Sequence, residues 1–242
     1  MNEMQHILST VRQAADKYSM LDNGDTVAVG LSGGKDSIAL LEALSRMKNF
    51  YPKRFELCAV TVDMGFEGDI YAPLRDFCAE RKIRYHVEKT AIKEIVFDIR
   101  REKNPCSLCA KLRRGALVSA CKALGVNKLA LGHHLDDAAE TFMLTLVNEG
   151  RIGCYSPVTV YEDSGITVIR PLVYTREADI KSLVKRETLP VVTSPCPENK
   201  NTDREKIKSA IRELEKNNRG LKKRIITAME KSGVDGWGQS PD

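Results

Sequence analysis

Six residues with phosphate-binding chemistry stand together at positions 32–37, where the sequence reads Ser-Gly-Gly-Lys-Asp-Ser. They follow an apolar, β-branched run and precede a helical pattern, which together predict a strand, a turn and a helix start. The glycines allow a tight turn and close approach of a ligand, and the N–H groups of a helix start attract anions. The loop therefore predicts a site for a phosphate chain. Its residues are Ser32, Gly33, Gly34, Lys35, Asp36 and Ser37.

This loop differs from the common phosphate-binding loop, in which Gly-x-x-x-x-Gly-Lys is followed directly by Ser or Thr. Here Asp36 follows Lys35, and the glycine spacing is one residue short. The pattern Gly-x-Gly-x-x-Gly of dinucleotide sites is absent too. An ordinary glycine turn at a strand end is the alternative, but six specialised residues at one junction favour a phosphate site.

A second polar loop, Gly-His-His-Leu-Asp-Asp at positions 132–137, also follows a short apolar run. Asp137 suits a magnesium ligand, because carboxylate oxygens bind this ion near phosphates. Gly132 leaves room for the phosphates. His133 and His134 are candidates to contact phosphate or sugar, and one of them to pack in the core. A zinc site built from these residues stays open, although the phosphate loop favours magnesium.

Three cysteines form a third candidate site. Cys106 and Cys109 stand three residues apart at a helix start among several Arg and Lys residues, and Cys196 lies between two prolines. Positive charge and a helix N-terminus lower the pKa of a thiol and favour the metal-binding thiolate. Three thiolates on a [4Fe–4S] cluster would leave one iron open to hold and deliver sulfide. Structural zinc and a redox pair stay open, with Cys154 as a candidate fourth ligand.

The elements that position these loops alternate along the first two thirds of the chain. Apolar runs at 26–31, 57–63, 84–88 and 128–131 are expected strands, with helical patterns between them. Such alternation predicts an α/β fold, a doubly wound parallel sheet covered by helices on both faces. Ligands of these sheets lie at the carboxyl ends of the strands, which is where the first two polar loops fall.

After Gly150 the pattern changes to a short β pair and then to helices, the first of which is expected to be capped by Thr175. The chain is therefore divided into residues 1–175, a nucleotide-binding domain that carries Cys106 and Cys109, and residues 176–242. This second part is a small, basic, helical extension that carries Cys196, and we expect its tail to be mobile from about residue 232.

Composition narrows the class of protein. Hydrophobic residues make up 42% and charged residues 29% of the 242 positions, as in ordinary globular proteins. No apolar stretch approaches the ~20 residues that span a bilayer, and the N-terminus lacks signal-peptide features, so we expect a cytoplasmic protein with no membrane contact. Seven cysteines argue against a disulfide framework.

The net charge of +5 is concentrated in two stretches. Residues 176–231 hold 15 basic and 9 acidic residues, and residues 100–114 hold six basic residues against one acidic. Solvated helix faces are the ordinary explanation of a charge run. Two basic stretches together favour a polyanionic partner such as a nucleic acid.

Three motifs, in this order and spacing, resemble the tRNA 2-thiocytidine synthetase family of cluster-dependent tRNA thiolases, within the ATP pyrophosphatase (PP-loop) superfamily. They are residues 32–37, residues 106–115 (Cys-Ser-Leu-Cys-Ala-Lys-Leu-Arg-Arg-Gly) and residues 132–137. The resemblance covers about residues 1–217. It implies an adenine nucleotide α-hydrolase-like fold, ATP with Mg²⁺, a tRNA substrate and a [4Fe–4S] cluster. By the same resemblance, Cys106, Cys109 and Cys196 hold the cluster, and the adenine lies beside Val62, Asp63 and Met64.

This resemblance implies a mechanism. The C2 oxygen of a pyrimidine attacks the α-phosphorus of ATP, pyrophosphate leaves, and sulfide then displaces AMP. The catalytic groups would be Lys35, Asp36, Cys106, Cys109 and Cys196. Basic residues near Arg113, Arg114, Lys222, Lys223 and Arg224 would hold the RNA backbone. A sulfide or persulfide donor is a further expected partner, a homodimer is allowed for, and the choice between cytidine and uridine stays open.

Two other functions fit the same motifs. One is a different adenylating enzyme of the superfamily, of the lysidine or GMP synthetase type, with structural zinc on the thiols; it would transfer nitrogen and need no iron. The other is a zinc-stabilised RNA-binding or ATP-binding module without catalysis, which would bind ATP without releasing pyrophosphate.

Overall fold

The computed structural model describes residues 3–100, 105–192, 196 and 203–239. Within them, one sheet of six strands has the order β3-β2-β1-β4-β6-β5. All neighbouring strands are parallel except β5, which pairs antiparallel with β6. The strands are β1 (Asp25–Gly30), β2 (Phe55–Asp63), β3 (Arg84–Lys89), β4 (Lys128–Ala130), β5 (Val158–Tyr161) and β6 (Ile166–Ile169).

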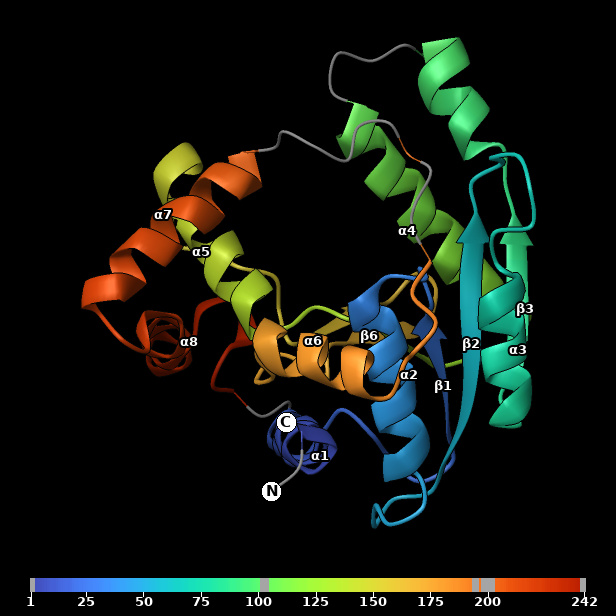
Figure 1. The fold of residues 1–242 in the computed structure, drawn as a ribbon, viewed down its shortest axis with the longest axis horizontal. Helices are drawn as coiled ribbons and strands as arrows, with labels where there is room; N and C mark the ends of the chain where they lie inside the picture. Colours follow the sequence, from blue (N-terminus) through green and yellow to red (C-terminus); the bar gives the residue numbers. More distant parts are fainter. Residues whose placement is uncertain (1–2, 101–104, 193–195, 197–202, 240–242) are drawn as a thin grey trace.

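Helices cover both faces of this sheet (Figure 1), which confirms the predicted doubly wound α/β fold. Helices α1, α2, α3 and α6 pack on one face, and α4 packs on the other. The helices are α1 (Glu3–Lys17), α2 (Lys35–Met47), α3 (Ala72–Glu80), α4 (Pro105–Ala123), α5 (Leu135–Glu149), α6 (Glu177–Arg186), α7 (Asp203–Asn217) and α8 (Leu221–Ser232), with the π-helix η1 (Glu94–Arg100) and the 3₁₀ turn η2 (Val234–Gly236).

Strand β1 shows why its apolar run has no polar alternation. Val27 and Val29 pack in the core cluster that contains helix α2, whereas Ala28, between them, packs in the cluster that contains Cys121 of α4. Successive side chains of a strand point to opposite faces, so a strand covered on both faces needs apolar residues at every position.

The parallel register brings the polar loops to one edge of the sheet. Gly30, the last residue of β1, pairs with Val60 of β2, and Val29 pairs with Ala130, the last residue of β4. The segments that leave β1 and β4 therefore begin side by side, and β2 continues to Asp63 along the same edge of the sheet. They include both loops that the sequence predicts to contact phosphates.

Two features of the fold were not anticipated. The β pair after Gly150 forms as expected, but β6 also pairs in parallel with β4 and so extends the main sheet. The segment Glu94–Arg100 forms a π-helix between β3 and α4, where no element was assigned.

The expected Thr175 cap of α6 is wrong. The N-cap position is Arg176, without a side-chain cap bond, and the Thr175 hydroxyl lies 2.7 Å from the hydroxyl of Thr10. Instead, the carboxylate of Asp136 accepts the Glu177 N–H at 2.7 Å. The Asp136 carboxylate of α5 therefore caps the start of α6, in place of the Thr175 side chain that the sequence suggested.

The C-terminal tail, for which we expected mobility from about residue 232, is packed on the core as far as Trp237. This side chain is fully buried, and its indole N–H donates to the Tyr155 carbonyl at 2.9 Å. It also makes an edge contact with the Tyr18 ring. Within the described residues, no helix is both long enough and apolar enough to span a membrane.

Trp237→Ala should destabilise the protein by about 3–5 kcal/mol, because it empties a fully buried aromatic site. Urea unfolding measures this change. Phe50→Ala is the control, since Phe50 is 51% exposed, and it should change the free energy of unfolding by no more than ~0.5 kcal/mol. Equal effects of the two substitutions would contradict the anchoring role of Trp237.

Candidate active site

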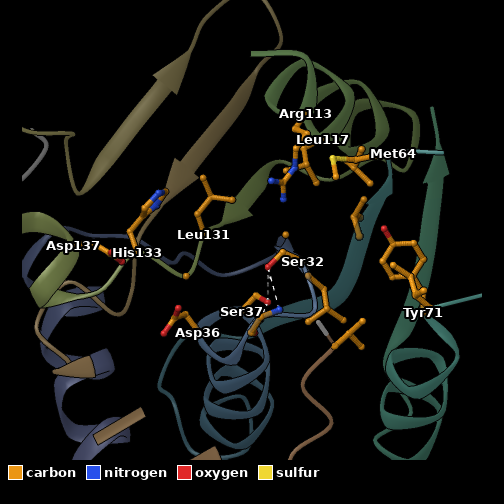
Figure 2. Close-up of a pocket in the computed structure, with 18 residues that line it drawn as sticks. Ser32, Asp36, Ser37, Met64, Tyr71, Arg113, Leu117, Leu131, His133 and Asp137 are labelled. Atoms are coloured by element: carbon orange, nitrogen blue, oxygen red, sulfur yellow. Dashed lines mark hydrogen bonds between the residues drawn. The ribbon is translucent and has the colours of Figure 1, made fainter. Parts of the chain in front are cut away.

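A cavity of about 600 Å³ opens at the carboxyl ends of β1, β2 and β4. Figure 2 shows side chains from the loops after β1 and β4 facing Arg113 and Leu117 of α4. The cavity thus combines both predicted phosphate-binding loops with the helix that carries Cys106 and Cys109. The sequence-predicted residues in its lining are Ser32, Gly34, Asp36, Ser37, Val62, Met64, Gly132, His133 and Asp137.

The first loop is ordered by its own hydroxyl groups. Ser37 Oγ donates to the Gly34 carbonyl at 2.9 Å and lies 3.1 Å from Ser32 Oγ. Ser32 Oγ also accepts the Gly34 N–H at 3.3 Å. No side chain caps the start of α2, so its first N–H groups are not satisfied by a capping side chain. This is the anion-binding arrangement that the sequence predicts.

Lys35 does not line the cavity, unlike its neighbour Asp36. Its Nζ donates to both Asp36 oxygens at 2.9 Å and lies 3.2 Å from Glu177 Oε1 at the start of α6. The ammonium group is therefore held in ion pairs beside the cavity. A ligand phosphate would have to compete with Glu177 for it.

The two histidines of the second loop have different surroundings. His134 forms a capping box with Asp137: His134 Nδ1 accepts the Asp137 N–H, and Asp137 Oδ2 accepts the His134 N–H. His133 lines the cavity and packs on the Tyr155 ring at 4.8 Å. Burial lowers the pKa of His133 to about 4, and its buried Nδ1 has no hydrogen-bond partner among the described residues.

Asp137 keeps one carboxylate oxygen outside the capping box. Its Oδ1 lies 3.9 Å from a guanidinium nitrogen of Arg204 in α7, and the residue lines the cavity. An oxygen ligand in this position fits a magnesium ion beside the phosphates. Gly132 lies against the first loop itself, because a Cβ there would be 3.0 Å from the backbone of Asp36 and Ser37.

Of the three candidate residues at the end of β2, two line the cavity and one does not. Val62 and Met64 line the cavity, as expected for contacts to an adenine. Asp63 is not in the lining: its carboxylate accepts the Gly65 N–H at 3.0 Å, and its carbonyl accepts the Thr90 N–H at 2.9 Å. Asp63 therefore shapes the turn that presents Met64.

The thiol of Cys109 lies 3.8 Å from the Met64 sulfur, and Arg113, one helical turn later, lines the cavity. Burial raises the pKa of Cys109, the Arg113 charge lowers it, and the neighbouring thiols of Cys196 and Cys106 raise it again. The prediction of a lowered pKa is therefore wrong for Cys109, because burial outweighs the cation. The Cys196 thiol is therefore close enough to Cys109 to influence its pKa.

Cys106, Cys109 and Cys196 are free thiols, the type of donor that an iron–sulfur cluster requires. All seven cysteines are free of disulfides, and among the described residues no three His, Cys, Asp or Glu side chains are close enough to hold one metal ion. A cluster needs wider spacing, since each thiolate binds a different iron. Cys154 is placed elsewhere, with its thiol donating to the Ala138 carbonyl at 3.6 Å, which removes the support for it as a fourth ligand.

Val192, which sequence reasoning did not single out, contacts the phosphate loop at Gly33. Its N–H donates to the Gly33 carbonyl at 2.9 Å, and its side chain lines the cavity. Gly33 has φ +84°, and a Cβ there would be 2.9 Å from Val192 Cβ. Only glycine therefore accommodates both this backbone conformation and this contact. No sequence pattern around Val192 indicates its hydrogen bond to Gly33 or its position in the cavity lining.

Comparison with known proteins agrees with this geometry. A family model described as a PP-loop domain matches residues 4–215. The chain belongs to the PP-loop family. A tRNA-cytidine(32) 2-sulfurtransferase of Geobacter sulfurreducens is 37% identical over 226 residues, 92% of this chain and 88% of that protein. A Pelobacter propionicus protein of the same name is 38% identical over 222 residues, 90% of this chain and 82% of that protein.

Two solved structures have a fold similar to that of this chain. The U34-tRNA thiolase NcsA from Methanococcus maripaludis, solved with its [4Fe–4S] cluster, is 28% identical with a TM-score of 0.75, covering 93% of this chain and 77% of that one. An NH3-dependent NAD synthetase from Campylobacter jejuni is 18% identical with a TM-score of 0.51, covering 100% of this chain and 99% of that one. The latter supports the fold alone.

Gly132→Ala should weaken ATP binding about tenfold, because the added Cβ displaces the PP-loop backbone by a few tenths of an ångström. Isothermal titration calorimetry with ATP measures this. Gly115→Ala is the control, since nothing lies within 4 Å of a Cβ at that helical position, and it should leave ATP affinity unchanged. Equal ATP affinities of the two variants would refute the packing role of Gly132.

Glu177 should contribute stability that depends on pH. Burial alone would raise its pKa, but hydrogen bonds and charges from Lys181, Lys35 and Lys208 lower it to about 2, from 4.5. Between these values the unfolded chain binds more protons, so wild-type stability should fall as the pH drops from 4.5 toward 2. Urea unfolding at several pH values should show a smaller fall for Glu177→Gln. The exposed Glu149→Gln is the control, and an identical pH slope in all three proteins would exclude this contribution.

Proposed function

We propose that this chain is an ATP-dependent tRNA thiolase that adenylates the C2 oxygen of a pyrimidine and replaces that oxygen with sulfur. One observation carries the proposal: a single cavity is lined by the PP-loop and by the helix of Cys106 and Cys109, with Cys196 nearby. The tRNA-cytidine(32) 2-sulfurtransferases are more similar to the chain than the uridine-34 enzyme is. Cytidine is therefore the base that we propose.

Activation of the base uses the phosphate loop and the end of β2. N–H groups of the PP-loop bind the phosphates, and Val62 and Met64 contact the adenine. The C2 oxygen then forms a bond to the α-phosphorus, and the α-phosphorus–oxygen bond to pyrophosphate breaks, with its electron pair leaving on pyrophosphate. Arg113 lines the cavity and stabilises the negative charge that develops. Asp137 Oδ1 would hold a magnesium ion, which would supply further positive charge beside the phosphates.

Sulfur transfer uses the three cysteines beside the cavity. Cys106, Cys109 and Cys196 would hold a [4Fe–4S] cluster, which would present sulfide from the sulfur donor to the adenylated base. The C2–sulfur bond forms as the C2–oxygen bond breaks, and AMP leaves with the electron pair. Cys109 packs with Val62, Met64 and Leu112 in an apolar cluster beside the cavity. Apolar walls exclude water from the adenylated base, whose hydrolysis would restore the starting oxygen.

The RNA substrate must present an unpaired base, because a stacked and paired pyrimidine cannot enter a cavity of this kind. The basic residues of α4 and α8 are suited to contact its phosphates. Arg113 is closer to the reacting groups than Arg114 is, because the Arg113 side chain lines the cavity and Arg114 is exposed. A cytoplasmic location, a sulfide or persulfide donor and a homodimer remain predictions of the sequence.

Cys106→Ala should abolish thiolation and leave ATP affinity unchanged, because Cys106 is an exposed thiol on α4 and is not part of the phosphate loop. Lys35→Ala should weaken ATP binding and leave cluster content unchanged. Mass spectrometry of nucleosides from tRNA treated with the anaerobically reconstituted enzyme measures thiolation, and calorimetry measures ATP binding. Cys78→Ala, in the core on α3, is the control for loss of a cysteine.

The same measurements address the zinc-based alternatives. A reconstituted protein that contains zinc and no iron, or that releases no pyrophosphate with ATP and tRNA, would contradict the thiolase. If Cys106→Ala lost ATP binding as well as thiolation, this would contradict the assignment of ATP binding to the phosphate loop and of sulfur transfer to the cysteines. Nucleosides of tRNA from cells lacking the protein identify the base and its position.

A further inference from the structure

The Met64 side chain lies between the cavity and a cysteine thiol. It lines the cavity and is 9% exposed, and its Sδ lies 3.8 Å from the Cys109 Sγ. Figure 2 shows Met64 in the cavity wall beside Leu117 of α4, the helix that also carries Cys109. A molecule that fills this part of the cavity would therefore contact Met64 and, through it, the thiol.

Hydrogen bonds fix the backbone on both sides of the Met64 side chain. The Met64 carbonyl accepts the Lys93 N–H at 2.8 Å, and the Asp63 carbonyl accepts the Thr90 N–H at 2.9 Å. The Asp63 carboxylate also accepts the Gly65 N–H at 3.0 Å. Contact from the cavity would therefore act on the side chain rather than on the backbone, and the methionine thioether with its three rotatable bonds adapts readily to such contact.

The surroundings of the thioether are apolar. Met64 belongs to a buried cluster with Ile92 and Val96, against which Leu112 and Cys109 pack. Packed interiors transmit a displacement of one side chain to its neighbours. Fixing the Met64 thioether therefore fixes the surroundings of the Cys109 thiol as well.

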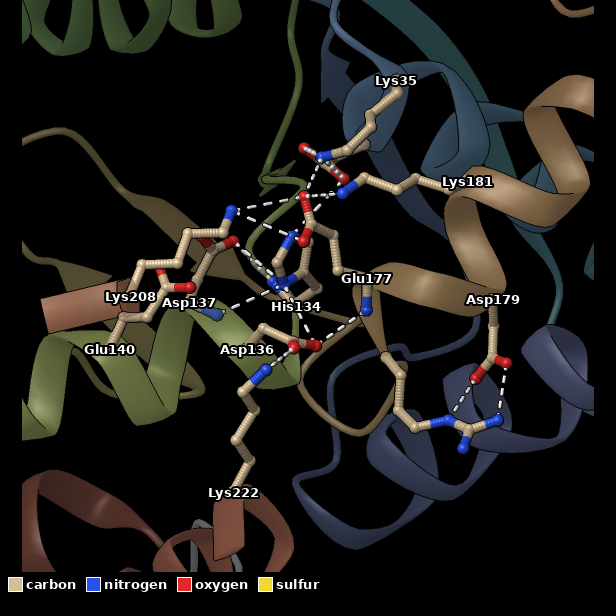
Figure 3. A network of polar contacts seen from close by, with 12 residues as sticks. Lys35, His134, Asp136, Asp137, Glu140, Glu177, Asp179, Lys181, Lys208 and Lys222 are labelled. Atoms are coloured by element: carbon tan, nitrogen blue, oxygen red, sulfur yellow. Dashed lines mark hydrogen bonds and ion pairs between the residues drawn. The ribbon is translucent and has the colours of Figure 1, made fainter. Parts of the chain in front are cut away.

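The phosphate end of the cavity has a different support. Figure 3 shows Lys35, Lys181 and Lys208 pointing toward Glu177, whose carboxylate lies within 3.4 Å of all three ammonium groups. These ion pairs hold α2, α6 and α7 together, whereas an adaptable thioether supports the adenine end. A change on nucleotide binding is therefore expected at Met64.

We propose that Met64 links nucleotide binding to the cysteine site: an adenine seated on the thioether holds it against the Cys109 thiol and closes that thiol off from water. The inference rests on the proposed function for the position of the adenine. Cys109 is partly exposed in the chain without a nucleotide, and an adenine that covers Met64 removes the freedom of the thioether to move away from it. The apolar wall is then complete while the activated base is present and must not be hydrolysed.

The test uses the full chain purified free of iron, together with AMP, which carries the adenine but cannot adenylate a base. Peptide mass spectrometry follows the alkylation of each cysteine by iodoacetamide, with and without saturating AMP. AMP should slow the alkylation of Cys109 severalfold, because the reaction requires access to the thiol. Cys106, an exposed thiol on the same helix, is the internal control and should react at the same rate in both conditions.

Substitutions of Met64 test whether the protection depends on its side chain. Met64→Ala removes the thioether, so saturating AMP should no longer protect Cys109. Met64→Leu keeps a side chain of similar volume and should retain the protection. Met143→Ala, which removes a half-buried methionine of α5, is the control for loss of a methionine and should retain it too. Calorimetry gives the AMP concentration that saturates each variant.

Equal protection of Cys109 in the wild type and in Met64→Ala, or no protection in the wild type, would overturn the inference. Slower alkylation of Cys106 and Cys109 to the same degree would also overturn it, because a nucleotide that stabilises the whole fold has that effect. If AMP protects Cys109 through Met64 but the reconstituted enzyme does not thiolate tRNA, the link stands and the proposed thiolase activity fails. If tRNA is thiolated and Cys109 is not protected, only the link fails.

Discussion

The contact between Gly33 and Val192 is the constraint on which the site depends. The Gly33 carbonyl accepts the Val192 N–H, and the missing side chain of Gly33 leaves the space that Val192 occupies. The phosphate loop and Val192 are thereby fixed to each other. Since Cys109 approaches the same cavity from α4, nucleotide chemistry and thiol chemistry share one small space.

Ion pairs make the C-terminal extension part of this site rather than an appendage. Lys222 of α8 donates to Asp136 at 2.7 Å, and the same carboxylate accepts the Glu177 N–H at the start of α6. Arg204 of α7 reaches Asp137 and Thr141 on α5. A boundary at residue 175 therefore separates stretches of sequence but cuts through one network of polar contacts.

The pKa of Cys109 depends on both burial and nearby charge, and the composition of the surrounding sequence reveals only the charge. Several cations flank Cys109 in the sequence, yet burial next to Met64 outweighs Arg113 and raises the pKa of the thiol. Desolvation acts on every group at a buried site, whereas a cation on the same helix acts only if its side chain turns inward. An apolar environment that opposes a free thiolate also keeps water away from an activated base.

The sequence by itself determined the parallel sheet, the two polar loops at the ends of its strands and the family, because strand and helix periodicity, glycine turns and helix starts are local properties of the chain. Only the tertiary structure decided that β6 joins β4, that Asp136 rather than Thr175 accepts the Glu177 N–H, and that Lys35 is shared with Glu177. It likewise brought Val192 onto Gly33. These are contacts between residues far apart in the chain, and their geometry depends on how whole elements pack, which no local pattern encodes.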